Sequence, residues 1–138
     1  MGEELISLDT AKIAKEKGFP QYGNELFDMY HPLNTPLMYY SDNHIWGYYY
    51  NMEPENRVAI IPPQSLLQKW LRDVHNLDVS VERGWVNKMP IYECVVWKLS
   101  QEYWVLLSEE DTLGITYEFK YEVALEKGLQ FALKKIKV

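Results

Sequence analysis

Apolar residues recur along positions 64–75 at the spacing of one face of an α-helix. At about 100° per residue they fall within an arc less than half the helix circumference wide, and polar residues fill the other side. The arc holds Leu66, Leu67, Trp70, Leu71 and Val74. Two prolines precede the first turn, where a missing N–H costs little, and Asn76 suits the left-handed geometry that ends a helix. The pattern predicts a central helix with its apolar face on a sheet and its cationic face free.

A second amphipathic pattern covers residues 121–137 and predicts a C-terminal helix. Its apolar stripe comprises Tyr121, Leu125, Leu129, Ala132, Leu133 and Ile136. Gly128 costs about 1 kcal/mol relative to alanine in mid-helix, so we expect it to permit the close approach of a neighbouring element. A shorter helix is expected from Ser7, its N-cap, to Lys17, with Gly18 as the glycine that ends it.

The remaining patterned segments show the two-residue alternation and the turn residues of β-strands. The predicted strands form a hairpin over 37–50, a short strand at 58–61 and further strands at 77–82, 91–99, 103–107 and 115–119, with a turn from Gly84 to Pro90. Turns about a dozen residues apart favour an antiparallel meander. We expect one α+β domain over residues 1–138: a mostly antiparallel sheet, two main helices (about 64–75 and 121–137) packed on one face, and a short N-terminal helix.

Length, composition and charge fit an ordinary globular domain. The 138 residues are 47% hydrophobic and 25% charged, which is typical of a chain that buries a core without disulfides. The net charge of −6 argues against sequence-independent binding to a nucleic acid polymer, although a local basic patch suits a small anion. Aromatic residues make up 14% of the chain, and such side chains line ligand pockets and protein interfaces as well as cores.

The location expected from the sequence is the cytoplasm. The single cysteine, Cys94, excludes an internal disulfide and fits a reducing compartment. No charged and then apolar leader begins the chain, and no apolar run approaches the ~18 residues needed to cross a bilayer. We expect no membrane partner.

Three segments carry a resemblance to a known family. The first is Gln-Ser-Leu-Leu-Gln-Lys-Trp-Leu-Arg at residues 64–72, followed by His75-Asn76; the others are the Lys/Ala helix at 7–19 and the helix at 121–134. Together with the tyrosine-rich hairpin at 39–50, they resemble a family of small bacteriophage and prophage proteins of Bacteroides-like gut bacteria. Pro63 departs from the family pattern, in which a threonine usually precedes Gln-Ser. The resemblance implies a phage-type protein of the bacterial host cytoplasm and brings no catalytic residues.

The sequence lacks the common catalytic patterns: a glycine-rich phosphate loop, a nucleophile-elbow serine, a His-Glu-x-x-His pair and paired cysteines. Cys94 lies in an apolar strand, where we expect a small buried thiol rather than a nucleophile. Asp42 and His44 supply only half of a metal site. His75 is expected to be partly exposed and stabilised at the negative end of its helix. We expect no enzyme activity, no metal and no cofactor.

Two cations of the central helix and three aromatic residues of the hairpin form a candidate ligand site. The cations suit a phosphate or carboxylate, and the rings suit stacking on a base. The candidate residues are Trp46, Tyr48, Tyr40, Lys69 and Arg72. The alternative interpretation stays open, namely that the cations form a solvated helix face and the tyrosines a half-buried sheet face.

Two functions are compatible with these features. The first is a phage-type binding protein without catalysis that sequesters a small anionic, nucleotide-like host signalling molecule and so acts against host defence. This rests on analogy with small phage proteins that bind host immune nucleotides. The alternative is a protein–protein interaction module or inhibitor of a host protein, which predicts a contiguous exposed apolar patch rather than a concave pocket. A homodimer is compatible with both.

Overall fold

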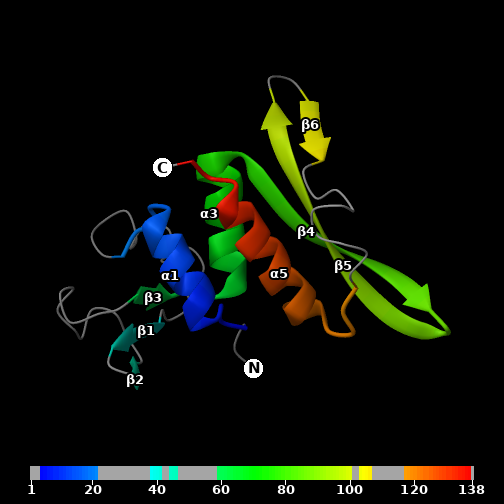
Figure 1. Ribbon diagram of the computed structural model, residues 1–138, viewed down its shortest axis with the longest axis horizontal. Coiled ribbons are helices and arrows are strands. Elements are labelled where there is room, and N and C mark those ends of the chain that lie inside the picture. The colour runs from blue at the N-terminus through cyan, green and yellow to red at the C-terminus, as the bar shows by residue number, and fades with distance from the viewer. Residues whose placement is uncertain are drawn as a thin grey trace. The chain divides into compact units, whose positions relative to one another are not determined.

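The computed structural model describes residues 4–21, 38–41, 44–46, 59–100, 103–106 and 117–137 (Figure 1). They divide into two compact units, and the boundary between the units falls inside the central helix, between Trp70 and Leu71. The first unit holds the residues before this boundary together with Lys137, and the second ends at Ile136. One globular domain over residues 1–138 stays a prediction.

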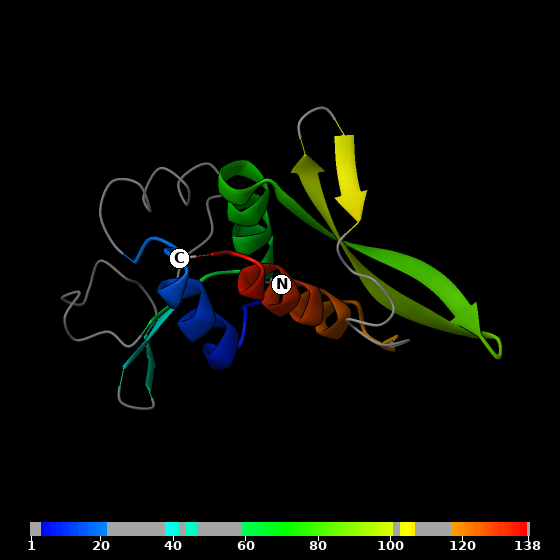
Figure 2. The same ribbon diagram turned by 45° about the horizontal axis from the view of Figure 1, so that its top comes forward.

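The first unit contains a short helix, a small sheet and the first part of the central helix. Its elements are α1 (Leu8–Glu16), β1 (Met38–Ser41), β2 (His44–Trp46), β3 (Ala59–Ile61) and the central helix α3 (Gln64–His75). The strands are antiparallel and pair in the order β2-β1-β3, and α1 lies beside β3 (Figure 1, Figure 2). The predicted hairpin and the short strand after it are confirmed for the residues described.

Both ends of α1 have the caps that the sequence predicts. The Ser7 hydroxyl accepts a hydrogen bond from the Thr10 N–H (3.2 Å), which satisfies one of the free donors of the first turn. At the other end Gly18 has φ 97°, and the Phe19 N–H donates to the Ala14 carbonyl (2.9 Å). This is the Schellman arrangement, in which a glycine takes the left-handed conformation and the next residue closes back on the helix.

The apolar arc of α3 is confirmed except at its end. Leu66, Leu67 and Leu71 are completely buried, and Trp70 is 3% exposed. The Trp70 ring packs edge to face against Phe19, with centroids 5.2 Å apart. Val74 is 53% exposed, so its predicted burial is wrong. Periodicity identifies the apolar side of a helix but not how far the covering elements extend along it, and here burial stops at Leu71.

Asn76 ends α3 as predicted. Its φ is 56°, the left-handed conformation that asparagine tolerates better than most residues. Its carbonyl oxygen accepts a hydrogen bond from the Leu99 N–H (3.0 Å). The turn that ends the helix is therefore fixed to the strand that carries Leu99.

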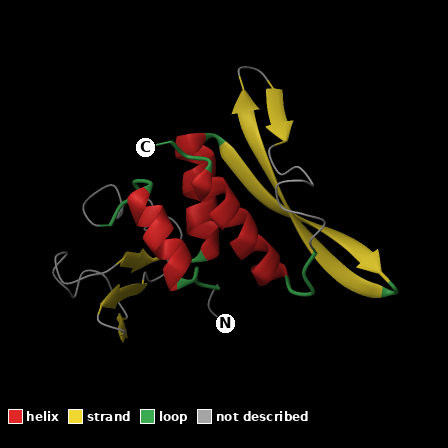
Figure 3. Cartoon of the chain, in the orientation of Figure 1, coloured by secondary structure: helices red, strands yellow, loops and turns green. Residues whose placement is uncertain are grey.

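The second unit is an antiparallel sheet with a helix on one face (Figure 3). Its elements are β4 (Leu77–Val86), β5 (Met89–Ser100), β6 (Tyr103–Leu106) and α5 (Tyr121–Lys134). The strands pair in the order β4-β5-β6, and α5 packs along β4 and β5 (Figure 1, Figure 2). The helix ends three residues before the predicted position 137, although Ile136 beyond it is still buried. Of the short strand predicted at 115–119, Glu118 forms one antiparallel bridge with Tyr92.

Gly128 permits the close approach that was predicted for it. A Cβ at this position would lie 2.8 Å from Cγ1 of Val79 and 2.9 Å from Cβ of Cys94. Real Cβ atoms almost never approach other atoms so closely. The helix therefore lies nearer to β4 and β5 at this point than any other residue type permits without a shift.

The predicted turn from Gly84 to Pro90 is wrong: both strands continue through it. The turn consists of Asn87 and Lys88 alone, with φ 49° and 67°, which is the two-residue type I′ geometry that matches strand twist. Gly84 lies opposite Ile91 within the ladder. The Tyr92 N–H donates to the Glu118 carbonyl (2.8 Å) and so points away from β4. Backbone N–H groups two residues apart on a strand point the same way, so an N–H at Pro90 would also point away from β4. The missing N–H of Pro90 therefore costs the β4–β5 ladder nothing.

The fold class is α+β, as predicted, and every strand pairing among the described residues is antiparallel. The strands form two three-stranded sheets rather than one continuous sheet. None of the described helices is both long enough and apolar enough to cross a membrane.

Candidate functional site

The aromatic part of the predicted ligand site lies in the small hairpin. Tyr40 belongs to β1 and Trp46 to β2, whereas Tyr48 lies outside the described residues. The backbone register pairs Tyr39 with Trp46 and Tyr40 with Ile45. Because cross-strand partners share a face and neighbours alternate, position 40 belongs to the opposite face of the hairpin from position 46. Their joint role in one site stays a prediction.

The two predicted cations lie on one side of α3. Lys69 and Arg72 are three residues apart, the spacing of neighbours on a helix surface. Lys69 is half-buried, and 46% of the Arg72 side chain is exposed. The helix therefore presents a cationic side opposite its buried apolar arc, as the sequence predicts.

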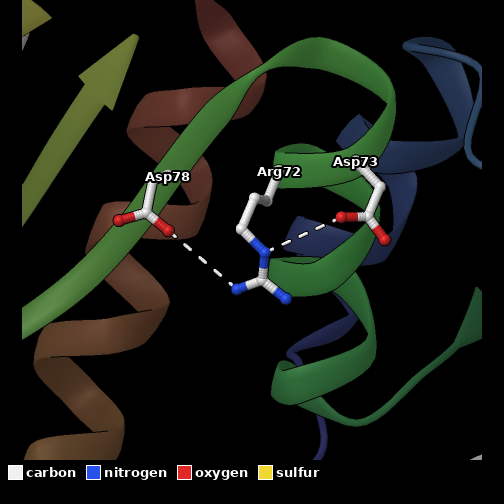
Figure 4. Close-up of polar contacts among 3 residues, drawn as sticks. All are labelled: Arg72, Asp73 and Asp78. Atoms are coloured by element: carbon white, nitrogen blue, oxygen red, sulfur yellow. Dashed lines mark ion pairs between the residues drawn. The ribbon is translucent and has the colours of Figure 1, made fainter. Parts of the chain in front are cut away.

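Arg72 already faces two carboxylates (Figure 4). Its Nε lies 3.7 Å from an oxygen of Asp73, and its Nη1 lies 3.9 Å from an oxygen of Asp78. Ion pairs this long and this exposed contribute about 0–1 kcal/mol to stability. A bound anion would nevertheless meet two negative groups beside one positive group. The local charge at Arg72 therefore does not favour an anion, and both acidic neighbours were visible in the sequence.

His75 differs from the expectation for a helix C-terminus. Partial burial lowers the pKa of its imidazole by desolvation, whereas an interaction with the helix dipole would raise it. The half-buried position is as predicted. Desolvation thus favours the neutral form of His75 more strongly than in an exposed imidazole.

Cys94 has the environment of a structural thiol. It lies on β5 beneath Gly128 and is half-buried. Burial raises the pKa of the thiol, and only a weaker opposing effect comes from a backbone hydrogen bond and from Lys127. A raised pKa lowers the fraction of thiolate, which is the reactive form. Within the described ranges, no three His, Cys, Asp or Glu side chains gather as metal ligands.

The end of the β4–β5 hairpin is a feature that sequence reasoning missed. Trp85 is 74% exposed and Met89 is 53% exposed. We call Arg83, Trp85, Lys88 and Pro90 the hairpin-end surface; all four are exposed. Met89 pairs with Val86 and therefore lies on the other face of the sheet from Trp85 and Pro90. The expected turn from Gly84 to Pro90 places Trp85 in a loop, whereas the residue lies in a strand next to a two-residue turn. The signal that finds this surface is Asn87-Lys88 between two strand-like runs, since asparagine favours the left-handed turn conformation.

A second exposed apolar group lies where α5 begins. Phe119, Tyr121 and Val123 are 56%, 38% and 40% exposed, and Glu122 beside them is also exposed. We call Phe119, Tyr121 and Glu122 the α5-start surface; Val123 lies about 200° from Tyr121 around α5 and belongs to another side of the helix. The Tyr121 ring contacts Tyr92 of β5 edge to face, with centroids 6.0 Å apart. This contact fixes the α5-start surface close to the hairpin-end surface within the same unit.

No protein-family model, curated protein or solved structure matches this chain. The most specific classification that these findings show is the α+β fold class. Kinship with small phage proteins stays a prediction.

Proposed function

We propose that this protein is a binding protein without catalytic activity that works through protein–protein contact at its hairpin-end surface. The observation that carries the proposal is the 74% exposure of Trp85. A large aromatic side chain left in water forgoes a substantial gain from burial. That gain becomes available when a partner covers the ring.

The composition and the rigidity of the hairpin end support this function. Trp and Arg are enriched in protein interfaces and are prominent among the residues that dominate binding energy. The type I′ turn of Asn87 and Lys88 holds both strands in register up to the tip. A surface on such a rigid element loses little conformational entropy on binding.

The absence of catalysis is part of the proposal. Cys94 is the chain's one thiol, and its raised pKa and partial burial are unsuited to nucleophilic chemistry. We also propose a reducing compartment such as the cytoplasm, in which a lone free thiol is stable.

A photo-cross-linking amino acid at position 85 tests the proposed function in the cells that make the protein. We expect covalent adducts to a protein from position 85 and none from position 74. Val74 is a matched control because it is also an exposed apolar residue, at 53%, but lies on α3. Equal adducts from both positions, or none from position 85, would contradict the proposal.

Sequestration of a nucleotide-like host signalling molecule is a second candidate. The observation in its favour is the placement of Lys69 and Arg72 on one side of α3, with Arg72 half exposed. A calorimetric screen with nucleotides tests it: binding at micromolar concentration that is lost in Arg72→Ala supports sequestration. No binding by any nucleotide removes it and leaves protein contact as the function.

A further inference from the structure

We infer that the hairpin-end surface docks on the α5-start surface of a second copy of this chain, forming a symmetric dimer. The inference deepens the proposed function by naming the partner at the hairpin end, and it rests on that function in requiring the hairpin end to be a contact surface. It follows from three properties of the second unit: an uncovered strip of sheet, complementary charge and sufficient apolar area.

The uncovered strip continues the face of the sheet on which α5 lies. Contacts of Gly128 with Val79 and Cys94 identify that face. Cross-strand pairing places Arg83 with Tyr92, and then Trp85 with Pro90, on the same face. The helix begins at Tyr121, whose ring contacts Tyr92. Between Tyr92 and Trp85, no helix or strand among the described residues of this unit covers the face.

The two surfaces carry opposite charge. The segment 83–92 contains Arg83 and Lys88 and no acidic residue, in a chain of net charge −6. The segment 117–127 contains Glu118, Glu122 and Glu126 against Lys120 and Lys127, and Lys127 pairs with Glu118. Glu122 is exposed and supplies the acidic group next to Tyr121. Docking one surface on the other therefore brings Arg83 of one copy toward Glu122 of the other.

A two-fold axis between the surfaces lets both contacts form at once. Successive residues on one face of a strand are about 7 Å apart, so Trp85 lies one such step beyond the level of Arg83 and Tyr92. When two hairpin ends lie side by side in opposite directions, the Trp85 ring of each reaches the Tyr121 side chain of the other. An isologous contact of this kind closes after two copies.

The available area is sufficient for a specific interface. At roughly 200 Å² per aromatic side chain, Trp85, Phe119 and Tyr121, which are 74%, 56% and 38% exposed, leave about 340 Å² of aromatic surface uncovered in each copy. Both copies together, with the exposed neighbours Arg83, Lys88, Pro90 and Glu122, reach the ~1,000 Å² that a specific interface needs.

Pairing through the edge of β4 that no described strand covers is a less suitable mode of self-association. That edge strand carries Asp78, Glu82 and Arg83. Charged side chains on edge strands are a common means of preventing strand addition. The hairpin end and the α5-start surface are therefore the better-matched pair.

Charge exchange between the two surfaces tests the inference by sedimentation and native mass spectrometry of the purified full chain. We expect the wild type to be dimeric, and Arg83→Glu and Glu122→Arg each to raise the dimer dissociation constant about tenfold or more, because each brings like charges together. An equimolar mixture of the two variants should form a heterodimer, since both of its contacts then pair opposite charges: the two introduced side chains meet in one, and the original Arg83 and Glu122 meet in the other.

Trp85→Ser should raise the dissociation constant by at least about 30-fold, as truncation of an anchoring residue does. The matched control Val74→Ser should leave it unchanged. Because Trp85 and Val74 are both exposed, we expect both variants to keep the thermal midpoint of the monomer, which separates loss of docking from loss of folding.

A wild-type protein that stays monomeric at near-millimolar concentration would overturn the inference. If position 85 still gave adducts to another protein in cells, the proposed function would stand with a different partner. If position 85 gave no protein adduct and the monomer instead bound vesicles of anionic phospholipid through Trp85, both the inference and the proposed function would be overturned.

Discussion

Single aromatic side chains show how differently one residue type serves this protein. Trp70 is 3% exposed and packs on Phe19, whereas Trp85 is 74% exposed. The two have the same side chain and lie fifteen positions apart. Helical periodicity predicts the first placement. No periodic signal predicts the second, because a residue near a hairpin tip is exposed by the position of the turn.

This contrast gives a matched pair of variants. Trp70→Ala should lower the free energy of unfolding by about 3–5 kcal/mol, since it removes a buried aromatic side chain and leaves a cavity. Trp85→Ala should change it by no more than about 0.5 kcal/mol, as an exposed residue does. Urea denaturation of monomeric protein measures both. Equal losses for the two variants would show that one of them is wrongly placed.

His75 makes stability depend on pH. Its pKa in the folded protein lies below the ordinary value of about 6.5. The unfolded chain therefore binds a proton first as the pH falls. The contribution of neutral His75 to the free energy of unfolding is fully present above about pH 6.5. It is lost as the pH falls toward the lower pKa that His75 has in the folded protein. Urea midpoints measured across this range should decline less in His75→Gln than in the wild type. Identical pH profiles would contradict the assignment.

At the scale of elements, the close packing of α5 on the sheet depends on Gly128. In an open helical site, Gly128→Ala would stabilise the protein by about 1 kcal/mol. Here the new Cβ meets Val79 and Cys94 at 2.8 and 2.9 Å, and overpacking costs about 1–3 kcal/mol. We expect a net loss in the free energy of unfolding.

A double-mutant cycle checks that the loss of stability comes from overpacking against Val79. Val79→Ala makes room for the added methyl group, so it should cost less in the Gly128→Ala protein than in the wild type. A stabilised Gly128→Ala protein would show that α5 lies further from the sheet than described.

The type I′ turn gives a second test at this scale. Lys88 has φ 67°, a conformation that most residues adopt at a cost and glycine adopts freely. Lys88→Gly should therefore raise the free energy of unfolding by up to about 1 kcal/mol, and Lys88→Val should lower it. Thermal and urea unfolding measure both variants. The reverse order would place the turn elsewhere, for instance at the Gly84–Pro90 segment expected from the sequence.

Features that depend on the residues of the element itself were predictable from the sequence. The caps of α1, the burial of Trp70, the left-handed Asn76 and the role of Gly128 all follow from local chemistry. The errors depend on what lies beside each residue in the fold. Val74 is exposed because the cover over α3 ends, and Gly84 and Pro90 continue their strands because a facing strand and an open edge accommodate them. For Pro90 the deciding neighbour, Glu118, is distant in sequence, whereas the partner of Gly84, Ile91, lies seven residues away across a turn that the sequence placed differently.

For the whole molecule, the candidate site was less predictable than the fold. Lys69 and Arg72 lie on the cationic side of α3 as expected, yet Asp73 and Asp78 lie beside Arg72. The hairpin-end and α5-start surfaces are far apart in sequence and are brought together by the Tyr92–Tyr121 contact. Sequence patterns identify which residues are apolar but not which apolar groups a fold leaves uncovered.

The most direct test is the indole N–H resonance of Trp85 in a spectrum of the full chain, assigned by its absence from Trp85→Phe. The central claim is that this side chain is a contact residue, covered by a second copy. We predict that its chemical shift changes as the protein is diluted from near-millimolar to low micromolar concentration, while that of buried Trp70 stays constant. A Trp85 resonance that is independent of concentration, in a chain that sediments as a monomer throughout, would contradict the account.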